Sequence, residues 1–368
     1  MNLLLKTYRL FSITINIVAG CLLLFSAYSH LIPPTAWKLP IYFALAFPVI
    51  LFIVVLLTVI QIFIRPRKYA LIPIVFLLIC TPAVRTCFPI GGGYSHNDKT
   101  TFTVMSYNIM AFREAEKTKN GTSNTLLDLI NQCGADVVCM QEYRTSTKPG
   151  ERYPTQRQVN KALSAYPYHH VSYPKNSKIG IACYSKHPIK KIEAIPFYNT
   201  PTPHRACLYE IEIDGRKLHL INCHMQSNQL DTHDRELYAQ ITQNPTHATD
   251  LLPQVGDKLL RKLSKAAIVR ADQAQILDNI IEKMPSSIVV CGDFNDTPQS
   301  YTYYKVRGNL HDAYVSAGFG PGITYHAAGF RFRIDHILHG EGLRTLDCDI
   351  IREKYSDHYP IIATLQYY

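Results

Sequence analysis

Two long apolar runs without charge restrict what this chain can fold into more than any other feature. Residues 10–29 and 40–64 contain no Lys, Arg, Asp or Glu. A helix that crosses a bilayer needs about 20 such residues at a rise of about 1.5 Å each. A cleaved signal peptide would explain the first run alone, but a second, longer run follows closely. We therefore expect at least two transmembrane helices ahead of any water-exposed domain.

A third apolar run, residues 69–84, is shorter and carries Pro73 and Pro82. Counting it as a span gives a membrane anchor over residues 1–87 with about three helices, at 10–29, 40–64 and 69–84. Positive charges in short loops mark the cytoplasmic side. Five lie before the first span or between the second and third, against two on the other side. We expect an integral protein of the inner or plasma membrane with a cytoplasmic N-terminus. The remaining chain is extracytoplasmic if the third run crosses, and cytoplasmic if it does not.

The formal charge of +10 is concentrated in this anchor. Residues 1–87 hold seven Lys and Arg and no Asp or Glu, while the other 281 residues hold 31 Lys and Arg against 28 Asp and Glu. The high pI is therefore poor evidence for nucleic-acid binding. The ten cysteines form no CxxC pair and lie mostly in apolar runs, which indicates buried thiols rather than disulfides or a zinc site.

The pattern changes after a glycine-rich linker at residues 88–100. Residues 101–368 alternate short β-rich runs with helical segments, which is typical of a layered α/β domain. Strands are predicted at 100–109, 135–142, 179–185, 207–214, 217–224, 286–293, 332–338 and 360–365. Helices are predicted at 122–132 and around 256–284.

Polar side chains follow several of these strands at the point where each apolar run ends. The residues in question are Asn108, Glu142, His224, Asp293 and Asn295, with Asp335, Asp357 and His358 in two later segments. Ligands commonly bind at such sheet rims, so a shared site is expected. Carboxylates beside amides are hard oxygen ligands that suit Mg²⁺, and histidines beside them can move protons. Together these side chains predict metal-assisted hydrolysis of a phosphate ester.

The six motifs SYNIM, MQE, NCH, GDFND, RIDHIL and SDHYPI occur in this order. The order resembles the endonuclease/exonuclease/phosphatase (DNase I-like) superfamily, in a membrane-anchored, bacterial-type form. Relatives include nucleases, neutral sphingomyelinases and inositol phosphatases. The resemblance covers about residues 100–368 and implies an α/β fold, a four-layer αββα sandwich of two mixed β-sheets.

The resemblance also implies a metal site. Glu142 matches the principal metal ligand, and Asn108 matches the amide that orients it and contacts the phosphate. Asp357 matches an additional carboxylate near the metal. The implied ion is Mg²⁺, with Mn²⁺ as an alternative.

The same resemblance implies the catalytic side chains. Asp293 matches the residue that holds or deprotonates the attacking water, and Asn295 the residue that positions this water and the phosphate. His358 matches a histidine that contacts the phosphate and is oriented through Asp335. His224 matches a proton donor to the leaving group. Which of these groups is the general base stays open.

Two features depart from the nuclease members. Some nucleases carry an acidic residue two positions after the first asparagine, where this chain has Met110. The sole tryptophan, Trp37, lies in the anchor, so no tryptophan of the later domain can wedge into a DNA stack.

Several further residues keep two interpretations. Arg205, Arg270 and Gln273 are either structural or close to the phosphate. The predicted helix within residues 250–283 carries a basic face made of Lys258, Arg261, Lys262 and Lys265. That face is either solvated or in contact with anionic headgroups, where each charge contributes about 1 kcal/mol.

The sequence thus predicts a membrane-anchored, Mg²⁺-dependent phosphoesterase that acts on phosphodiesters close to the bilayer. Its partner would be a phosphoester substrate, either a lipid headgroup or another membrane-associated phosphoester. A nuclease of the same mechanism, acting on DNA or RNA, is the alternative. A catalytically dead membrane scaffold is a lesser alternative, because no expected ligand or histidine is missing.

Overall fold

The structure is a computed structural model. It describes all residues except 1, 65, 94–99, 113–124, 176, 198–204, 231–233, 235 and 237–247. At residues 2–6, 125, 248–257 and 328 it describes the backbone alone.

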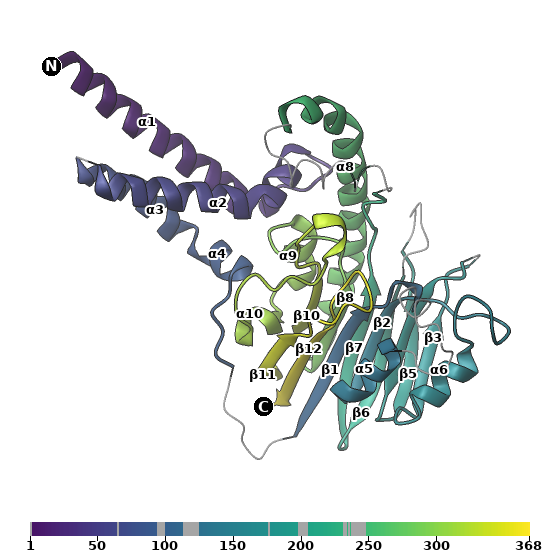
Figure 1. Cartoon of the computed structure of the whole chain (residues 1–368). Coiled ribbons are helices and arrows are strands. Elements are labelled where there is room, and N and C mark those ends of the chain that lie inside the picture. Colours follow the sequence, from purple (N-terminus) through teal and green to yellow (C-terminus); the bar gives the residue numbers. More distant parts are fainter. Residues whose placement is uncertain are drawn as a thin grey trace.

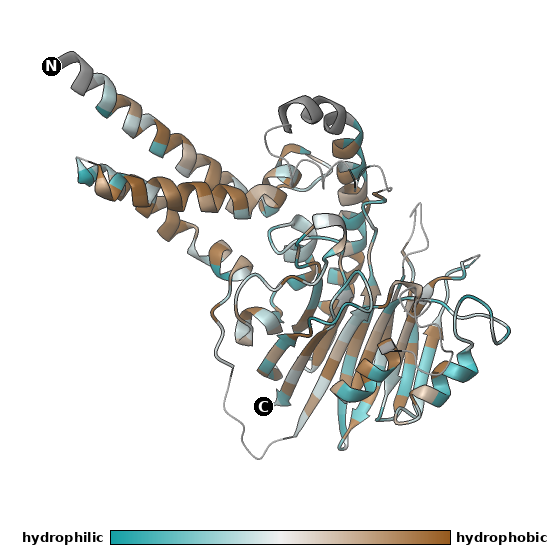
Figure 2. Ribbon diagram, viewed as in Figure 1, coloured by the Kyte–Doolittle hydropathy of each residue, from teal (hydrophilic) through white to brown (hydrophobic). Residues whose placement is uncertain are grey.

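The chain begins with two long helices, α1 (Asn2–Ala27) and α2 (Leu39–Phe63). Among the described residues, Thr7–Ala27 and Leu39–Phe63 are the two helices long and apolar enough to cross a membrane. Figure 2 shows hydrophobic colouring along α2 and α3 in particular. The helices extend away from the β-rich part of the molecule, with the N-terminus at the far end (Figure 1).

The third apolar run is not one continuous helix. The short 3-10 helix η2 (Arg67–Ala70) leads into α3 (Leu71–Ile79), which is bent by 63° against α4 (Thr81–Cys87). Pro82 stands in the first turn of α4. Because proline has no N–H to bond back to a carbonyl one turn earlier, the helix breaks here. The described residues therefore hold two spans by length, or three if the bent pair is one span.

The rest of the chain forms two six-stranded mixed sheets, as the sequence predicts. The first sheet has the order β11-β12-β1-β2-β4-β3. Its strands are β1 (Thr101–Asn108), β2 (Val137–Tyr143), β3 (Tyr168–Ser172), β4 (Gly180–Ser185), β11 (Leu343–Ile350) and β12 (Ile361–Tyr367).

The second sheet has the order β5-β6-β7-β8-β10-β9. Its strands are β5 (Ile189–Ile195), β6 (Arg205–Ile213), β7 (Arg216–His224), β8 (Ile288–Asp293), β9 (His311–Asp312) and β10 (Asp335–His339).

The sheets pack face to face over a buried core that includes Val104, Cys139, Tyr209 and Val289. Outside the first sheet, a second core lies under α5 (Thr125–Cys133) and α6 (Gln156–Ala162). Outside the second sheet, a third core lies under α8 (Ala248–Ile281) and α9 (Tyr301–Arg307). Three further short helices are η1 (Ser29–Leu31), α10 (Ala313–Ala317) and η5 (Ala327–Gly329). The result is the expected four-layer αββα sandwich (Figure 1).

The helical N-terminal part docks directly on this sandwich. His30, between α1 and α2, stacks on Tyr304 of α9 with 3.5 Å between ring centroids. Tyr42 of α2 donates its hydroxyl to the Leu260 carbonyl of α8 at 3.0 Å. From α4, the Thr86 carbonyl accepts from Arg333. Both the α1–α2 connection and α4 therefore lie against the sandwich.

The expected linker is bound to the sandwich where it is described. Gly91 donates its N–H to the Gly318 carbonyl at 2.9 Å, and the Pro89 carbonyl accepts from Gly320 N–H at 2.9 Å. Residues 94–99 of the linker lie outside the described residues.

Candidate active site

The expected polar residues come together at one rim of the two sheets. Asn108 ends β1 and Glu142 lies near the end of β2, which runs parallel to β1. His224 ends β7 and Asp293 ends β8, again a parallel pair. Asp335 begins β10, which is antiparallel to β8, so it lies beside Asp293 in the register. Because parallel strands end at the same edge, each pair of motifs meets there.

Local backbone geometry directs two of these side chains. Glu142 has φ +51° and lies in a bulge where the β2–β4 register shifts between Met140 and Tyr143. Such bulges re-aim side chains and are frequent beside functional sites. Gly292 allows β8 to approach β7: a Cβ there would lie 1.9 Å from the Cys223 carbonyl oxygen. The residue next to Asp293 is therefore restricted to glycine.

Asp293 is the centre of the cluster and is buried. Its carboxylate accepts from Asn108 Nδ2 at 2.9 Å and from the Asn295 N–H at 2.8 Å. The Nε2 atoms of His224 and His358 each lie 3.7 Å from Asp293 Oδ2. One carboxylate thus contacts or faces four of the other expected residues.

His358 and Asp335 form a buried pair beside it. His358 Nδ1 donates to Asp335 Oδ2 at 2.8 Å. Burial by itself would lower the pKa of His358, but the carboxylates of Asp335 and Asp293 raise it to about 10. Burial raises the pKa of Asp293, and Asp335 raises it further. The two carboxylates therefore hold His358 in its cationic form at neutral pH.

The amides are also held by the backbone. Asn295 has φ +53° and donates Nδ2 to the Met225 carbonyl at 3.1 Å. Asn108 reaches Glu142 Oε1 at 3.4 Å with the same Nδ2 that bonds Asp293. Ser356 donates to the Asn108 carbonyl at 2.7 Å, which ties the last motif to the first. Asp357 follows Ser356 and lines the same cavity as Glu142.

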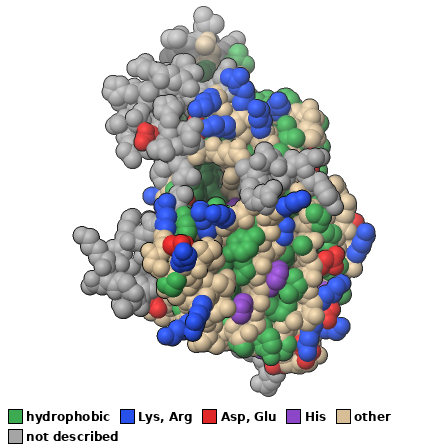
Figure 3. Space-filling model, turned by 90° about the vertical axis from the view of Figure 1, so that its right-hand side faces the viewer, with side chains coloured by type: hydrophobic (Ala, Val, Ile, Leu, Met, Phe, Trp, Pro, Cys, Tyr) green, Lys and Arg blue, Asp and Glu red, His purple; other side chains and the backbone are tan. Residues whose placement is uncertain are grey.

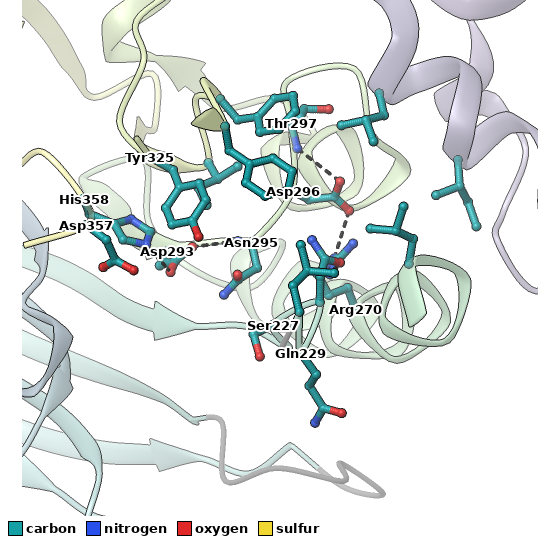
Figure 4. Close-up of a pocket in the computed structure, with 18 of the residues that line it drawn as sticks. Ser227, Gln229, Arg270, Asp293, Asn295, Asp296, Thr297, Tyr325, Asp357 and His358 are labelled. Carbon is teal, nitrogen blue, oxygen red and sulfur yellow. Dashed lines mark hydrogen bonds and ion pairs between the residues drawn. The ribbon is translucent and has the colours of Figure 1, made fainter. Parts of the chain in front are cut away.

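That cavity has a volume of about 240 Å³. Glu142, Asp293, Asn295, Asp357 and His358 line it, and Figure 4 shows Asp293, Asp357 and His358 together at one end. The lining continues through Arg270 and Asp296 to apolar side chains, among them Ile41 and Leu45 of α2. Asn108, His224 and Asp335 stand behind this surface, in contact with residues that line it.

Two donor sets could hold a metal ion. Among the described residues, Asp293, Asp335 and His358 have ligand atoms within 4.8 Å of one another. The second set is the one expected from the sequence, with Glu142, Asn108 and Asp357. In the first set, His358 Nδ1 is already bonded to Asp335 Oδ2 at 2.8 Å.

Arg270 and Gln273 have structural contacts that account for them. The Arg270 guanidinium bonds Asp296 Oδ2 at 3.0 Å and the Gln226 carbonyl at 2.9 Å. Gln273 accepts from the Gln226 N–H at 2.9 Å. Arg205 donates to Ser172 Oγ at 2.7 Å. These bonds favour the structural interpretation of all three.

The helix that carries the basic face, α8, also lines the cavity with other residues. Lys262 forms an ion pair with Asp234, and Lys265 is exposed. Leu259 and Leu263, on the same helix, line the cavity. In Figure 3 Lys and Arg side chains gather on the upper part of the viewed face, near a hollow that contains hydrophobic side chains.

The sequence did not single out several residues of the site. Tyr325, whose ring centroid lies 4.9 Å from that of His358, lines the cavity with Phe330 and Phe332. These three lie in an irregular segment without strand periodicity, so no pattern marks them. In the sequence, Ile41 and Leu45 are indistinguishable from the other residues of an apolar span.

Two family models match separate parts of this chain. A model of the Endonuclease/Exonuclease/phosphatase family matches residues 105–358, and a model described as Domain of unknown function (DUF8431) matches residues 8–87. No curated protein matches the chain.

Two solved structures are similar in fold. The endonuclease/exonuclease/phosphatase from Beutenbergia cavernae has a TM-score of 0.51 at 14% identity, covering 73% of this chain and 72% of its own. The family protein from Leptotrichia buccalis has a TM-score of 0.50 at 19% identity, covering 72% and 100%. Because the family model spans more than half of the residues and the fold agrees with it, this chain belongs to the endonuclease/exonuclease/phosphatase family.

Proposed function

We propose that this protein is a membrane-anchored, Mg²⁺-dependent phosphoesterase that hydrolyses phosphodiester bonds by attack of water. One observation carries the proposal: the buried Asp293 carboxylate lies among two amides and two histidines at the end of an open cavity. This donor set can hold a water, bind a phosphoryl group and move protons. A scaffold without catalysis needs no such arrangement.

The residues fit a resident magnesium ion. Glu142 is turned by its bulge toward Asn108, and Asp357 lines the same end of the cavity. These side chains offer the hard oxygen ligands that Mg²⁺ or Mn²⁺ prefers. When bound, the ion would polarise the phosphoryl oxygens and favour the nucleophilic form of water.

Each remaining side chain has a role that its contacts support. Asp293 holds the attacking water and accepts its proton, with Asn108 and Asn295 fixing the carboxylate. His358, kept protonated by Asp335, stabilises charge on the phosphoryl oxygens. His224, whose Nε2 lies 3.7 Å from the Asp293 carboxylate, would supply the proton that the leaving group takes up.

The catalytic domain lies on the extracytoplasmic side in this proposal. The α1–α2 connection and α4 both contact the sandwich, through His30 and Thr86. Both therefore lie at the end of the helices away from the N-terminus and η2 (Figure 1). Because Arg67, Lys68 and the N-terminal charges mark the cytoplasmic end, this arrangement supports α3 and α4 as the returning third span.

A hydrolysis assay tests the proposal. The full chain in nanodiscs should hydrolyse bis(p-nitrophenyl) phosphate with Mg²⁺ and stop when a chelator is added. The Asp293→Asn variant should lose about 10²–10⁴-fold in kcat, while Asp272→Asn, an exposed change on α8, keeps wild-type turnover. Hydrolysis that survives both the chelator and Asp293→Asn would refute the proposal.

A further inference from the structure

The cavity has two chemically different ends. The polar end holds Asp293, Asp357 and His358. The other end is apolar where Ile41 and Leu45 of α2 and Leu259 and Leu263 of α8 line it. A phosphoester that fills both ends must carry an apolar group as well as its phosphate.

The apolar end is built by a membrane helix. Ile41 and Leu45 are one turn apart on α2, and Leu259 and Leu263 have the same spacing on α8. Residues with this spacing share one helix face, so the two helices present facing apolar pairs to the cavity. The hydrogen bond from Tyr42 to the Leu260 carbonyl holds these helices together. In Figure 4 the pale purple ribbon of the N-terminal helices borders the end of the pocket opposite Asp293 and His358.

Part of this wall belongs to a helix that is long and apolar enough to cross a membrane. Leu45 lies within the 25-residue apolar helix Leu39–Phe63, and Ile41 lies in its first turn. A membrane lipid beside α2 carries the apolar group that this end would bind, whereas a nucleic-acid strand does not.

We infer that the apolar end is a binding subsite for the hydrocarbon chain of a membrane lipid phosphodiester, with Ile41 and Leu45 of the anchor as part of the substrate site. The inference rests on the proposed function for the position of the phosphate. The whole cavity, with its polar end, measures about 240 Å³, and an apolar cavity of about 150 Å³ takes up benzene.

A homologous series of substrates tests it. The full chain in nanodiscs is given p-nitrophenyl alkyl phosphates from methyl to octyl, and kcat/KM is measured for each. We expect kcat/KM to rise by up to about fourfold per methylene until the cavity is full. Leu45→Trp, which fills the cavity, should flatten the series. Leu56→Trp, the same change at a lipid-exposed position of α2, should keep the wild-type slope.

Leu263→Trp fills the cavity from α8 and should flatten the series in the same way. Because the two substitutions lie on different helices, a folding defect in one helix cannot explain a flat series in both variants. A flat series in an active wild-type protein overturns the inference and leaves the phosphoesterase standing. If the wild-type protein hydrolyses none of these substrates, the proposed function fails. The inference is then decided by the equilibrium affinity of the wild-type protein for alkyl phosphates from methyl to octyl. Empty nanodiscs measure the binding of these compounds to the lipid alone. Affinity that rises with chain length in the wild type and not in Leu45→Trp supports the subsite. Affinity independent of chain length overturns it.

Discussion

His358 donates Nδ1 to the Asp335 carboxylate at 2.8 Å, while its Nε2 lies 3.7 Å from Asp293. One imidazole therefore links a buried carboxylate at the start of β10 to the carboxylate at the end of β8. The pair brings the last motif of the chain to the rim formed by the central strands. Asp335 and Asp293 both raise the pKa of this imidazole, which places a positive charge beside the Asp293 carboxylate.

Replacing Asp335 with Asn should lower both the pKa of His358 and the turnover. Asparagine can still accept from Nδ1, but it removes the negative charge that raises this pKa to about 10. We expect kcat to fall by about 10²–10³-fold, with the alkaline limb of the pH–rate profile moved to lower pH. Proton NMR of His358 reads the pKa directly. Asp347→Asn, a change at an exposed position, is the control. If His358 has the same pKa in Asp335→Asn as in the wild-type protein, Asp335 does not have this role.

Removing the Glu142 carboxylate should abolish stabilisation by Mg²⁺. Ligands that bind the folded state alone stabilise it by about 2.7 kcal/mol at 100 times Kd. Wild-type protein should melt at a higher temperature with Mg²⁺ than with chelator, and Glu142→Gln should not. Glu193→Gln, an exposed change on the edge strand β5, should behave as wild type. Equal Mg²⁺ stabilisation of Glu142→Gln and wild type would move the metal to the Asp293, Asp335 and His358 set.

Acid should weaken the docking of the anchor at His30. Burial lowers the pKa of His30 to about 4, and Arg307 also lowers it, against an opposing hydrogen bond with the Ala27 carbonyl. The docked form thus holds His30 in its neutral form. The contribution of His30 to the stability of the docked form is complete above pH 6.5 and is lost as the pH falls toward 4. Trp37, between α1 and α2, reports the change by fluorescence. His30→Phe keeps the stacking on Tyr304 and should remove this pH dependence; a transition that persists would point to another group.

Gly292→Ala should destabilise the sandwich by more than about 3 kcal/mol. Its φ is +145°, and the new Cβ would lie 1.9 Å from the Cys223 carbonyl of β7. Gly215→Ala separates the cost of the positive φ from the cost of the steric clash, because Gly215 also has a positive φ but has open space around it. That control should cost only about 1 kcal/mol in denaturant unfolding. Equal costs would mean that strand contact at Gly292 is unimportant.

Apolar runs made most strands of the α/β domain predictable, and the missed strands show the limit of that pattern; the four-layer sandwich itself was implied by the family resemblance. The pattern marked β1, β2 and β6 to β8 because their side chains are buried between layers. It missed β5, an edge strand whose residues Lys190, Lys191 and Glu193 are exposed, so that no apolar alternation marks it. The helix at 256–284 begins earlier in the structure, as α8 from Ala248.

The candidate site was predictable where a polar residue ends an apolar strand. Asp293 and His224 are such residues, and the fold brings them within 3.7 Å. The contribution of Ile41 was not predictable, since an apolar residue at the start of a span looks the same whether it faces lipid or a cavity. That distinction depends on docking contacts such as Tyr42 to Leu260, which join parts of the chain far apart in sequence.

The most direct measurement gives the full chain two substrates in parallel, the phospholipids of its own bilayer and plasmid DNA, in the presence of Mg²⁺. The Asp293→Ala variant is the control. We expect release of phosphate-containing headgroup from the lipids, which the control lacks, while the plasmid DNA stays intact. Nicking or degradation of DNA that Asp293→Ala abolishes, with the lipids unchanged, would contradict it and make this protein a tethered nuclease.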